Sequence, residues 1–248
     1  MIFGDRPSDA RQNQVMSLQT SSQTLAHIPL FKSLSDEAIR RLDTQCIWRR
    51  ASAGDYILQY KDGGRDLYFV VQGHVRVLIQ AISGKESILR DIVDGEYFGE
   101  LSAIDDQPRS AAIVAVTNAV IAKMPSAVFR QAVHEHPDVC DQLLMLLASQ
   151  VRMLANRVNE YSTLDVPRRI YAELLRLARP AGKGAAGESV ISPPPTHAEL
   201  AARVSSHREA VTRELKKLEA AGLLQRRRGA IVIVDAKSLA KLVEDAAE

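Results

Sequence analysis

The chain has 248 residues, of which 46% are hydrophobic and 25% are charged, and its formal net charge is +2. This composition excludes a disordered or fibrous chain, and the length suits two domains with a core each. Because no apolar run reaches the length of a signal peptide or a membrane span, and Cys46 and Cys140 lie far apart, we expect a reduced cytoplasmic protein with no membrane segment, zinc site or iron-sulfur cluster.

The first part of the chain is expected to contribute little to the fold. Residues 1–24 are polar and rich in Gln and Ser, so they are expected to form a mobile tail. Apolar residues then recur between Leu25 and Leu42, and Ser35 stands where it can cap a helix that begins at Asp36. We expect short helices here, packed beneath the next structure.

Residues 25–139 are expected to form one domain with a β-rich centre at 46–124. Short runs of β-branched and aromatic residues, such as 68–71, 75–79 and 112–116, are separated by turns. The turns contain glycines: Gly54, Gly73, Gly84, Gly95 and Gly99. Many short strands broken by glycine turns predict an antiparallel barrel or roll.

The hydrophobic period becomes helical in residues 140–164. Apolar residues recur in alternating steps of four and three: Cys140, Leu144, Leu147, Val151, Leu154, Val158 and Tyr161. A helix packed on its own barrel would also explain so short a series, but a strict heptad seam favours a parallel homodimer through this helix.

Residues 165–248 are expected to form the last domain. They carry 15 basic and 11 acidic side chains, a net charge of +4, against −2 for the rest of the chain, which is a modest indication of a polyanionic partner. Asp165 before Val166-Pro167 predicts a helix start and a hinge. The glycine- and proline-rich residues 179–195 predict a loop.

A tandem pair of helices is predicted near the C-terminus. Thr196-x-x-Glu199 and Ser206-x-x-Glu209 each have the pattern of a capping box, and residues 204–206 form the turn between them. This arrangement predicts a helix-turn-helix. The segment 223–234 after Gly222 predicts a β-hairpin wing.

The second of these helices has an inward stripe of Val211, Leu215 and Leu218, so its polar residues face outward. Arg can donate two hydrogen bonds to guanine, and Glu can accept one from cytosine. An ordinary solvated surface, with Glu209 only capping its helix, is the alternative, but the ordered combination favours double-stranded DNA. The predicted DNA-binding residues are Ser206, Arg208, Glu209, Thr212, Arg213 and Lys216, with Arg226, Arg227 and Arg228 of the wing holding phosphates.

From about residue 25 to its end, the chain resembles the catabolite activator/fumarate-nitrate regulator (CRP/FNR) family. The most specific stretch is 98–111, Phe-Gly-Glu-Leu-Ser-Ala-Ile-Asp-Asp-Gln-Pro-Arg-Ser-Ala, which is similar to the phosphate-binding cassette of cyclic-nucleotide domains. The resemblance implies an α+β fold: a cyclic-nucleotide-binding antiparallel β-roll of jelly-roll type, a long dimerisation helix and a C-terminal winged helix-turn-helix. It also implies a transcription regulator that is not an enzyme and has RNA polymerase as a partner.

The resemblance assigns the ligand contacts residue by residue. Arg109, helped by Ser110, holds the phosphate, Glu100 accepts a hydrogen bond from the ribose 2′-OH, and the backbone of Gly99, Leu101 and Ser102 closes around the sugar and phosphate. This fits the chemistry of a cyclic nucleotide, which offers one phosphate charge and one ribose hydroxyl. An ion pair between Arg109 and Glu100 in an empty roll is the alternative.

The base contact departs from the family pattern. Members that bind cyclic AMP carry Thr-Ser on the dimerisation helix, where this chain has Leu154-Ala155, and neither residue can hydrogen-bond a base. Ala155 and Asn156 are the residues expected to face the base, with Asn156 or Asn159 as substitute donors. Cyclic AMP and cyclic GMP therefore both stay open.

The expected DNA site also follows from the resemblance. Arg208-Glu209 and Arg213 match the family positions, which implies half-sites of the TGTGA kind in a palindromic operator with half-sites roughly 34 Å apart. Ser205 replaces a glycine often found in the turn, and we expect a small geometric adjustment. The expected mechanism is a population shift, in which ligand contact near 154–156 favours one arrangement of the hinge near Asp165.

Three alternatives remain open. The chain could bind DNA independently of nucleotide or respond to another effector, or it could be a cyclic-nucleotide module that acts through protein partners. Haem or metal sensing would depend on His74, His134 or His136, which are lone histidines of the kind that is usually structural.

Overall fold

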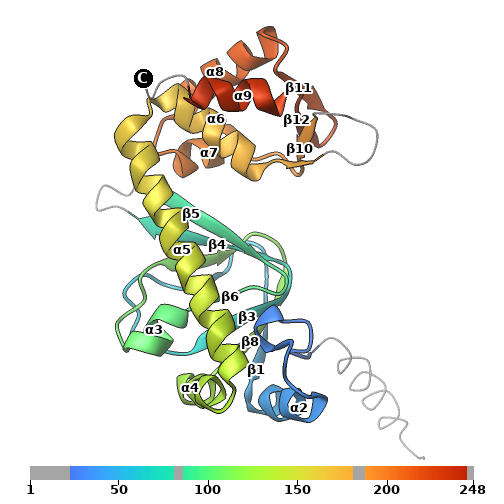
Figure 1. The fold of residues 1–248 in the computed structure, drawn as a ribbon, viewed down its shortest axis with the longest axis vertical. Helices are drawn as coiled ribbons and strands as arrows, with labels where there is room; N and C mark the ends of the chain where they lie inside the picture. Colours follow the sequence, from blue (N-terminus) through green and yellow to red (C-terminus); the bar gives the residue numbers. More distant parts are fainter. Residues whose placement is uncertain (1–22, 81–85, 181–187, 245–248) are drawn as a thin grey trace, which may run out of the picture. The chain divides into compact units, whose positions relative to one another are not determined.

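The computed structural model describes residues 23–80, 86–180 and 188–244. The chain divides into two compact units, one holding residues up to 79 together with 90–146, the other holding 80–89 and the residues from 147 onward. Figure 1 traces both units along the chain. The tail expected at residues 1–24 falls almost entirely outside the described residues, as does Gly84.

Two short helices precede the strands of the first unit, as the sequence predicts. The 3₁₀ helix η1 spans Pro29–Phe31 and helix α2 spans Asp36–Gln45. The Ser35 hydroxyl accepts a hydrogen bond from the Ala38 amide at 3.3 Å, which confirms the predicted N-cap. Helix α2 continues to Gln45, three residues beyond the predicted apolar stretch.

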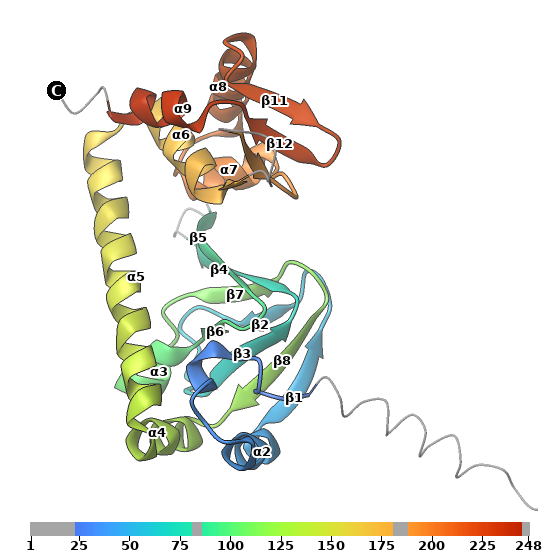
Figure 2. The ribbon, with the colours of Figure 1, turned by 45° about the vertical axis from the view of Figure 1, so that its right-hand side comes forward.

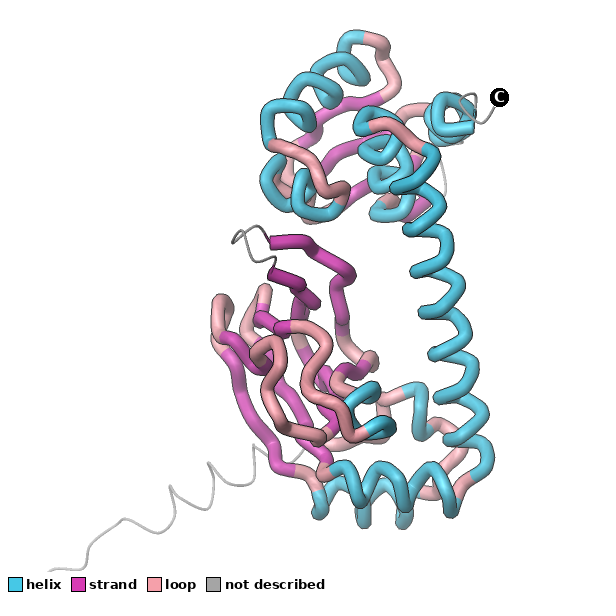
Figure 3. Tube along the Cα trace, turned by 90° about the vertical axis from the view of Figure 1, so that its left-hand side faces the viewer, coloured by secondary structure: helices cyan, strands magenta, loops and turns pink. Residues whose placement is uncertain are grey.

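The strands between residues 47 and 124 form an antiparallel roll of two four-stranded sheets, with the strand orders β1-β8-β3-β6 and β2-β7-β4-β5. Its strands are β1 (Ile47–Ala51), β2 (Tyr56–Leu58), β3 (Leu67–Gln72), β4 (His74–Gln80), β5 (Glu86–Val93), β6 (Tyr97–Phe98), β7 (Ala112–Ala115) and β8 (Ala119–Met124). Figure 3, with strands in magenta, shows the roll with helices at one end. The predicted roll is confirmed.

Strand β8 is central to the first sheet, pairing with β1 through Arg49↔Ile121 and with β3 through Phe69↔Ala122. Because side chains alternate along a strand, Ala122 and Met124 lie on the same face as Phe69, and all three are buried in the core. The turn between β3 and β4 requires glycine, because Gly73 has φ +106° and a Cβ there would lie 2.6 Å from the Asn118 carbonyl oxygen.

Three further helices follow along the chain: α3 (Glu100–Asp105) and α4 (Ser126–Glu135) in the first unit, and the long α5 (Pro137–Thr163), which begins in the first unit and ends in the second. Sequence patterns predict only α5, which begins three residues before the heptad series. Helices α2 and α4 lie at the same end of the roll (Figures 1 and 2). No helix in the described ranges is long and apolar enough to cross a membrane.

The second unit continues beyond α5 with α6 (Val166–Leu177), β9 (Arg179–Pro180), β10 (Ser189–Ile191), α7 (His197–Arg203), α8 (Arg208–Ala220), β11 (Leu224–Arg227), β12 (Ala230–Ile233) and α9 (Ala236–Glu244). The Asp165 carboxylate caps α6 by accepting from the Arg168 amide at 3.0 Å, as predicted. The strands form one sheet of order β11-β12-β10-β9, so the hairpin wing is confirmed.

The loop predicted at 179–195 is wrong at two places, because β9 and β10 pair there and extend the wing sheet. Short strands of two and three residues carry too little periodicity to be recognised in a Gly- and Pro-rich stretch. Residues 181–187 lie outside the described part of the chain.

The helix-turn-helix is formed by α7 and α8, and only the first of its two predicted capping boxes exists. Thr196 and Glu199 satisfy each other's backbone amides as predicted. At the second helix the N-cap is His207, without a side-chain cap, so the predicted box at Ser206 and Glu209 is wrong. The turn is longer than expected: Ser206 is buried, and its amide donates to the Ala201 carbonyl at 2.9 Å.

Ser205 adopts φ +50°, the left-handed region, so a glycine position is occupied here by serine. We expect Ser205→Gly to raise the free energy of unfolding by about 0.5–1 kcal/mol, since relief of backbone strain outweighs the added entropy of the unfolded chain. Thermal unfolding of the full chain measures this. Ser206→Gly is the matched control, because Ser206 is buried and has no positive φ. This change should lower the free energy of unfolding. Equal effects of the two changes on that free energy would refute the backbone argument.

Candidate functional site

The cassette begins where β6 runs into α3 through Gly99, which has φ +84°. A Cβ at this position would lie 2.7 Å from Arg109 Nη1 and 3.0 Å from the Asp66 carbonyl oxygen. A side chain would therefore displace the guanidinium group, and only glycine both adopts this backbone and leaves the space.

Arg109 is the buried cation of the roll, with 2% of its surface exposed. Nη1 donates to the Gly99 carbonyl at 3.0 Å, Nη2 donates to the Asp66 carbonyl at 2.7 Å, and the guanidinium carbon lies 5.5 Å from the centre of the Tyr68 ring. Burial lowers the pKa of Arg109, while Tyr68 and Asp66 oppose that shift. Nε has no hydrogen-bond partner among the described residues.

Glu100 opens α3 and is also buried, with 6% of its surface exposed. Within the described ranges no ion pair joins Glu100 to Arg109, so the two charges do not neutralise each other at ion-pair distance. Buried charges of this kind are stable only with further compensation. The site therefore has the chemistry to accept an anion at Arg109 and to hold a hydroxyl donor at Glu100.

The other predicted ligand residues are distributed over both units. Ser102 is buried in α3, whereas Leu101 and Ser110 are exposed. Ala155 and Asn156 lie on the part of α5 that belongs to the second unit, and both are exposed. Their contact with a ligand stays a prediction.

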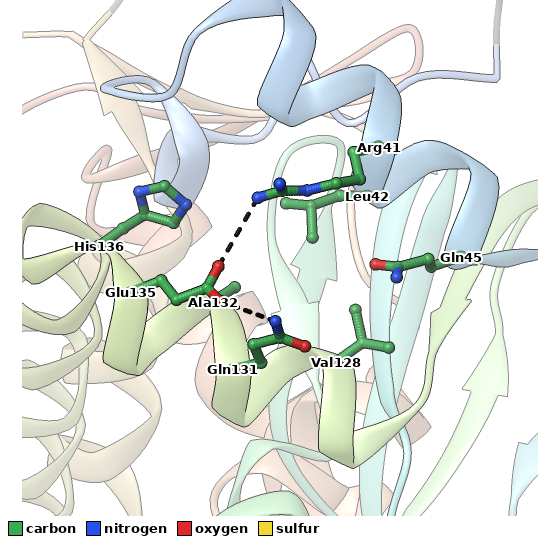
Figure 4. A pocket seen from close by; sticks show the side chains of 8 residues that line it. All are labelled: Arg41, Leu42, Gln45, Val128, Gln131, Ala132, Glu135 and His136. Atoms are coloured by element: carbon green, nitrogen blue, oxygen red, sulfur yellow. Dashed lines mark hydrogen bonds and ion pairs between the residues drawn. The ribbon is translucent and has the colours of Figure 1, made fainter.

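A separate hollow of about 100 Å³ lies between α2 and α4 (Figure 4). Arg41 and Glu135 approach across it at 3.6 Å, and Gln131 Nε2 donates to Glu135 at 2.7 Å. This volume is well below the roughly 300 Å³ of a typical small-molecule site. Arg41, Gln131 and Glu135 already bind one another there, so we assign no ligand to the hollow.

The outward face of α8 collects most of the residues predicted to bind DNA. Val211, Leu215 and Leu218 are buried, as the helical period predicts. The opposite face opens as a shallow hollow of about 500 Å³ lined by Arg208, Glu209, Thr212, Arg213 and Lys216. Three cations and one carboxylate on one exposed helix face suit the acceptor and donor groups of a DNA groove. The sixth predicted residue, Ser206, is buried in the turn.

His197, the first residue of α7, organises this surface and was not anticipated. Its Nε2 lies 3.1 Å from Arg226 Nη2 of the wing, and its Nδ1 lies 2.7 Å from Thr212 Oγ1 of α8. Arg226 can only donate, so Nε2 accepts and Nδ1 carries the proton. The Thr212 hydroxyl then donates to the Arg208 carbonyl at 2.9 Å. A neutral imidazole thus connects the wing to the outward face of α8.

Burial, followed by Arg226 and Arg208, lowers the pKa of His197 below its usual value of 6.5. A histidine whose folded-state pKa is depressed contributes stability above its unfolded pKa and loses it as the pH falls. We expect the melting temperature of the wild type to fall more steeply between pH 7 and pH 5 than that of His197→Asn. His207→Asn, an exposed neighbour, is the control, and parallel curves for wild type and His197→Asn would contradict the assignment.

The wing arginines are partly engaged within the second unit. Arg226 Nε lies 2.5 Å from Glu219, and Arg227 Nη2 lies 3.1 Å from Glu188, whereas Arg228 is exposed. Their contact with phosphates stays a prediction. Among the described residues no group of three or more His, Cys, Asp or Glu could hold a metal ion.

Comparison with known proteins matches both parts of the chain. Residues 48–136 match the family described as cyclic nucleotide-binding domain, and residues 168–242 match the Crp-like helix-turn-helix domain. A CRP-like cAMP-activated global transcriptional regulator of Mycobacterium tuberculosis is 27% identical over 88% of this chain and 98% of its own length. The cAMP-activated global transcriptional regulator CRP of Salmonella typhimurium is 29% identical over 82% and 97%. The chain belongs to the CRP/FNR family of transcription regulators.

The CRP/FNR assignment agrees with the fold. A solved structure of the c-di-GMP-responsive global regulator CLP of Xanthomonas campestris superimposes with a TM-score of 0.68 at 24% identity, over 80% of this chain and 99% of that one. At this identity the likeness shows the fold alone. As a CRP/FNR member, the chain is a DNA-binding transcription regulator and not an enzyme, and the predicted α+β class with a β-roll and a winged helix-turn-helix is confirmed.

Proposed function

We propose that this chain acts as a homodimeric regulator whose binding to a palindromic operator is controlled by a cyclic nucleotide held at Arg109 and Glu100. Cyclic AMP is the first candidate effector and cyclic GMP the second. The proposed domains are a tail at 1–24, the nucleotide-binding roll at 25–139, the dimerisation helix at 140–164 and the DNA-binding domain at 165–248.

The observation that carries the proposal is the state of Arg109. Among the described residues, this guanidinium group is buried to 2% exposure, bonds to two carbonyls and leaves Nε without a partner, which makes it a preformed site for an anion. Arginine offers a planar fork of donors that matches phosphate oxygens. Ser110 and the backbone of Gly99, Leu101 and Ser102 are the proposed further contacts.

The identity of the base depends on α5. Leu154 and Ala155 offer no side-chain hydrogen bond, so Asn156 and Asn159, both exposed, are the proposed partners of the base. The Mycobacterium and Salmonella relatives are described as cAMP-activated, and the Xanthomonas neighbour as c-di-GMP-responsive. We therefore place cyclic AMP first and use cyclic di-GMP as a third ligand in binding experiments.

The proposed dimer rests on an exposed apolar stripe along α5. Val151 and Val158 are each 66% exposed, and Leu144, Leu154 and Tyr161 are also exposed. Apolar side chains at heptad spacing on a free helix face are expected to pair with the same helix of a second copy. Twofold symmetry would then place two α8 helices on half-sites roughly 34 Å apart. RNA polymerase is the proposed protein partner, and the cytoplasm the proposed location.

A second candidate function is a nucleotide module that acts through protein partners and has no use for DNA. The outward face of α8 disfavours it, since Arg208, Glu209 and Arg213 lie together where a protein-only module needs no base-reading chemistry. A regulator with another effector, or with none, would keep this face and differ only at the cassette.

Base reading by Arg213 provides the test of DNA recognition. We expect Arg213→Ala to reduce discrimination at one base pair of the half-site by roughly 5- to 150-fold while non-specific binding survives. The measurement is the affinity for an operator selected from random duplexes and for each of its single-base variants. Lys216→Ala is the contrasting variant, because a lysine on phosphate should weaken all sequences equally. Uniform weakening by Arg213→Ala would assign Arg213 to phosphate instead.

A further inference from the structure

The second unit contains a buried ionic cluster that DNA binding does not explain. Glu173 of α6 is 1% exposed and is surrounded by three guanidinium groups. Arg157 Nη2 of α5 lies 3.2 Å from Oε2, Arg203 Nη1 of α7 lies 3.6 Å from Oε1, and Arg176 Nη1 bonds to Oε2. One carboxylate thus joins the dimerisation helix to two helices of the DNA-binding domain.

This cluster, defined as Arg157, Glu160, Glu173, Arg176 and Arg203, brings three positive charges together with two negative ones. Arg176 Nη2 also contacts Glu160 at 2.5 Å. Burial lowers the pKa of Arg176, but the Glu173 and Glu160 carboxylates outweigh that effect and raise it. A buried ion network contributes little net stability but strongly disfavours any arrangement that leaves one member unpaired. Such a network specifies one geometry.

The same face of α5 also contacts the end of α7, directly before the turn of the helix-turn-helix. Arg157 Nη1 donates to the Arg203 carbonyl at 2.9 Å, and the Tyr161 hydroxyl donates to the same oxygen at 3.0 Å. Arg203 is the last residue of α7, and this carbonyl is one that no later helical amide would satisfy. It directly precedes the turn at 204–206, after which α8 begins at Arg208.

We propose that Arg157, Tyr161 and Glu173 are positioning residues that hold the helix-turn-helix turn on the end of α5, so that movement of α5 is transmitted to α8. Arg157 follows directly after Asn156, the proposed base contact, and this transmission role rests on the proposed function. Two donors on one carbonyl, anchored by a buried carboxylate, make the end of α7 follow α5. Coupling of this kind requires an element with two arrangements that both sites bias. In this proposal α5 is that element, and its fixed contact with the end of α7 carries its position to α8.

The first test uses hydrogen exchange of the full chain without any nucleotide, so it does not depend on the identity of the effector. The amide of Ser206 is bonded to the Ala201 carbonyl, and that of Val204 to the Leu200 carbonyl. We expect exchange in peptides covering 200–208 to be about tenfold faster in Arg157→Ala and faster in Tyr161→Phe. Arg152→Ala, an exposed arginine on the same helix, should match the wild type. Unchanged exchange in Arg157→Ala would overturn the proposal.

The second test measures how far nucleotide changes DNA binding. The measured quantity is a ratio: the affinity for the selected operator duplex with saturating cyclic AMP or cyclic GMP, divided by the affinity without nucleotide. In Arg157→Ala this ratio should fall toward one, while nucleotide binding by calorimetry and non-specific DNA binding stay as in Arg152→Ala. Arg157→Lys keeps a charge near Glu173 but loses the planar fork and should give an intermediate ratio. A wild-type ratio retained in Arg157→Ala would overturn the proposal. If neither nucleotide changes the operator affinity of the wild type, the proposed effector is wrong. The hydrogen-exchange result then tests by itself whether Arg157 and Tyr161 hold the end of α7.

Discussion

Arg109→Leu is expected to weaken cyclic AMP binding by at least about 100-fold, because it removes two or more charge-assisted hydrogen bonds worth roughly 1.5–3 kcal/mol each. Isothermal calorimetry of the purified, nucleotide-stripped chain measures this directly. The same titration with cyclic GMP and cyclic di-GMP identifies the preferred ligand. Whatever the base, the loss should be similar for every nucleotide that binds, since Arg109 is assigned to the phosphate.

Two variants separate the loss of the phosphate contact from a loss of fold. Arg65→Leu removes an exposed arginine that pairs with Asp106 at 3.3 Å in the same unit, and its binding should be unchanged. Arg109→Lys retains the charge but not the fork and should recover only part of the affinity. Thermal unfolding of each variant reports on the roll, because Arg109 also bonds to Gly99 and Asp66. Wild-type affinity in a folded Arg109→Leu would remove Arg109 from the site.

The double variant Val151→Glu/Val158→Glu is expected to convert the dimer to a monomer at micromolar concentration and to weaken operator binding by about 100-fold or more. Both side chains are 66% exposed on α5, and four carboxylates would meet in the proposed seam, where burial of unpaired charge is costly. A monomer reads one half-site only. Sedimentation velocity gives the oligomeric state, and fluorescence anisotropy gives the DNA affinity.

Ser149→Glu is the matched control for the dimer seam. At about 100° per residue, Ser149 faces away from both Val151 and Val158, and it is exposed. It adds one carboxylate to the same helix without reaching the seam, so dimerisation and DNA binding should match the wild type. A dimeric double variant would place the interface elsewhere on the chain.

The features that sequence predicts correctly depend on short-range patterns. The Thr196–Glu199 box and the Asp165 cap involve residues three apart, and the outward face of α8 follows from the helical period alone. Glycine turns between β-rich runs were sufficient for the roll. Each of these signals lies within a few residues of the element it specifies.

The features that sequence misses depend on partners distant in the chain or on backbone conformation. Glu173 and Glu214 are charged residues of the kind usually found at the surface, yet both are buried. The partner Arg157 lies 16 residues before Glu173. The Tyr171 hydroxyl, 43 residues before Glu214, donates to it at 2.9 Å. Ser206 resembles an N-cap, but the left-handed Ser205 lengthens the turn and buries it. No local pattern distinguishes such residues from solvated ones.

The central claim is that nucleotide binding in the roll controls DNA binding by α8. The measurement that tests it most directly is the affinity of the wild-type dimer for its selected operator duplex, at fixed salt, with and without saturating cyclic AMP and cyclic GMP. We expect one of the two nucleotides to change that affinity by about 5- to 150-fold, the usual range of allosteric coupling, with no change for Arg109→Leu. An equal affinity in the presence and absence of both nucleotides would contradict the account and leave a CRP/FNR regulator whose DNA binding is controlled by another signal or by none.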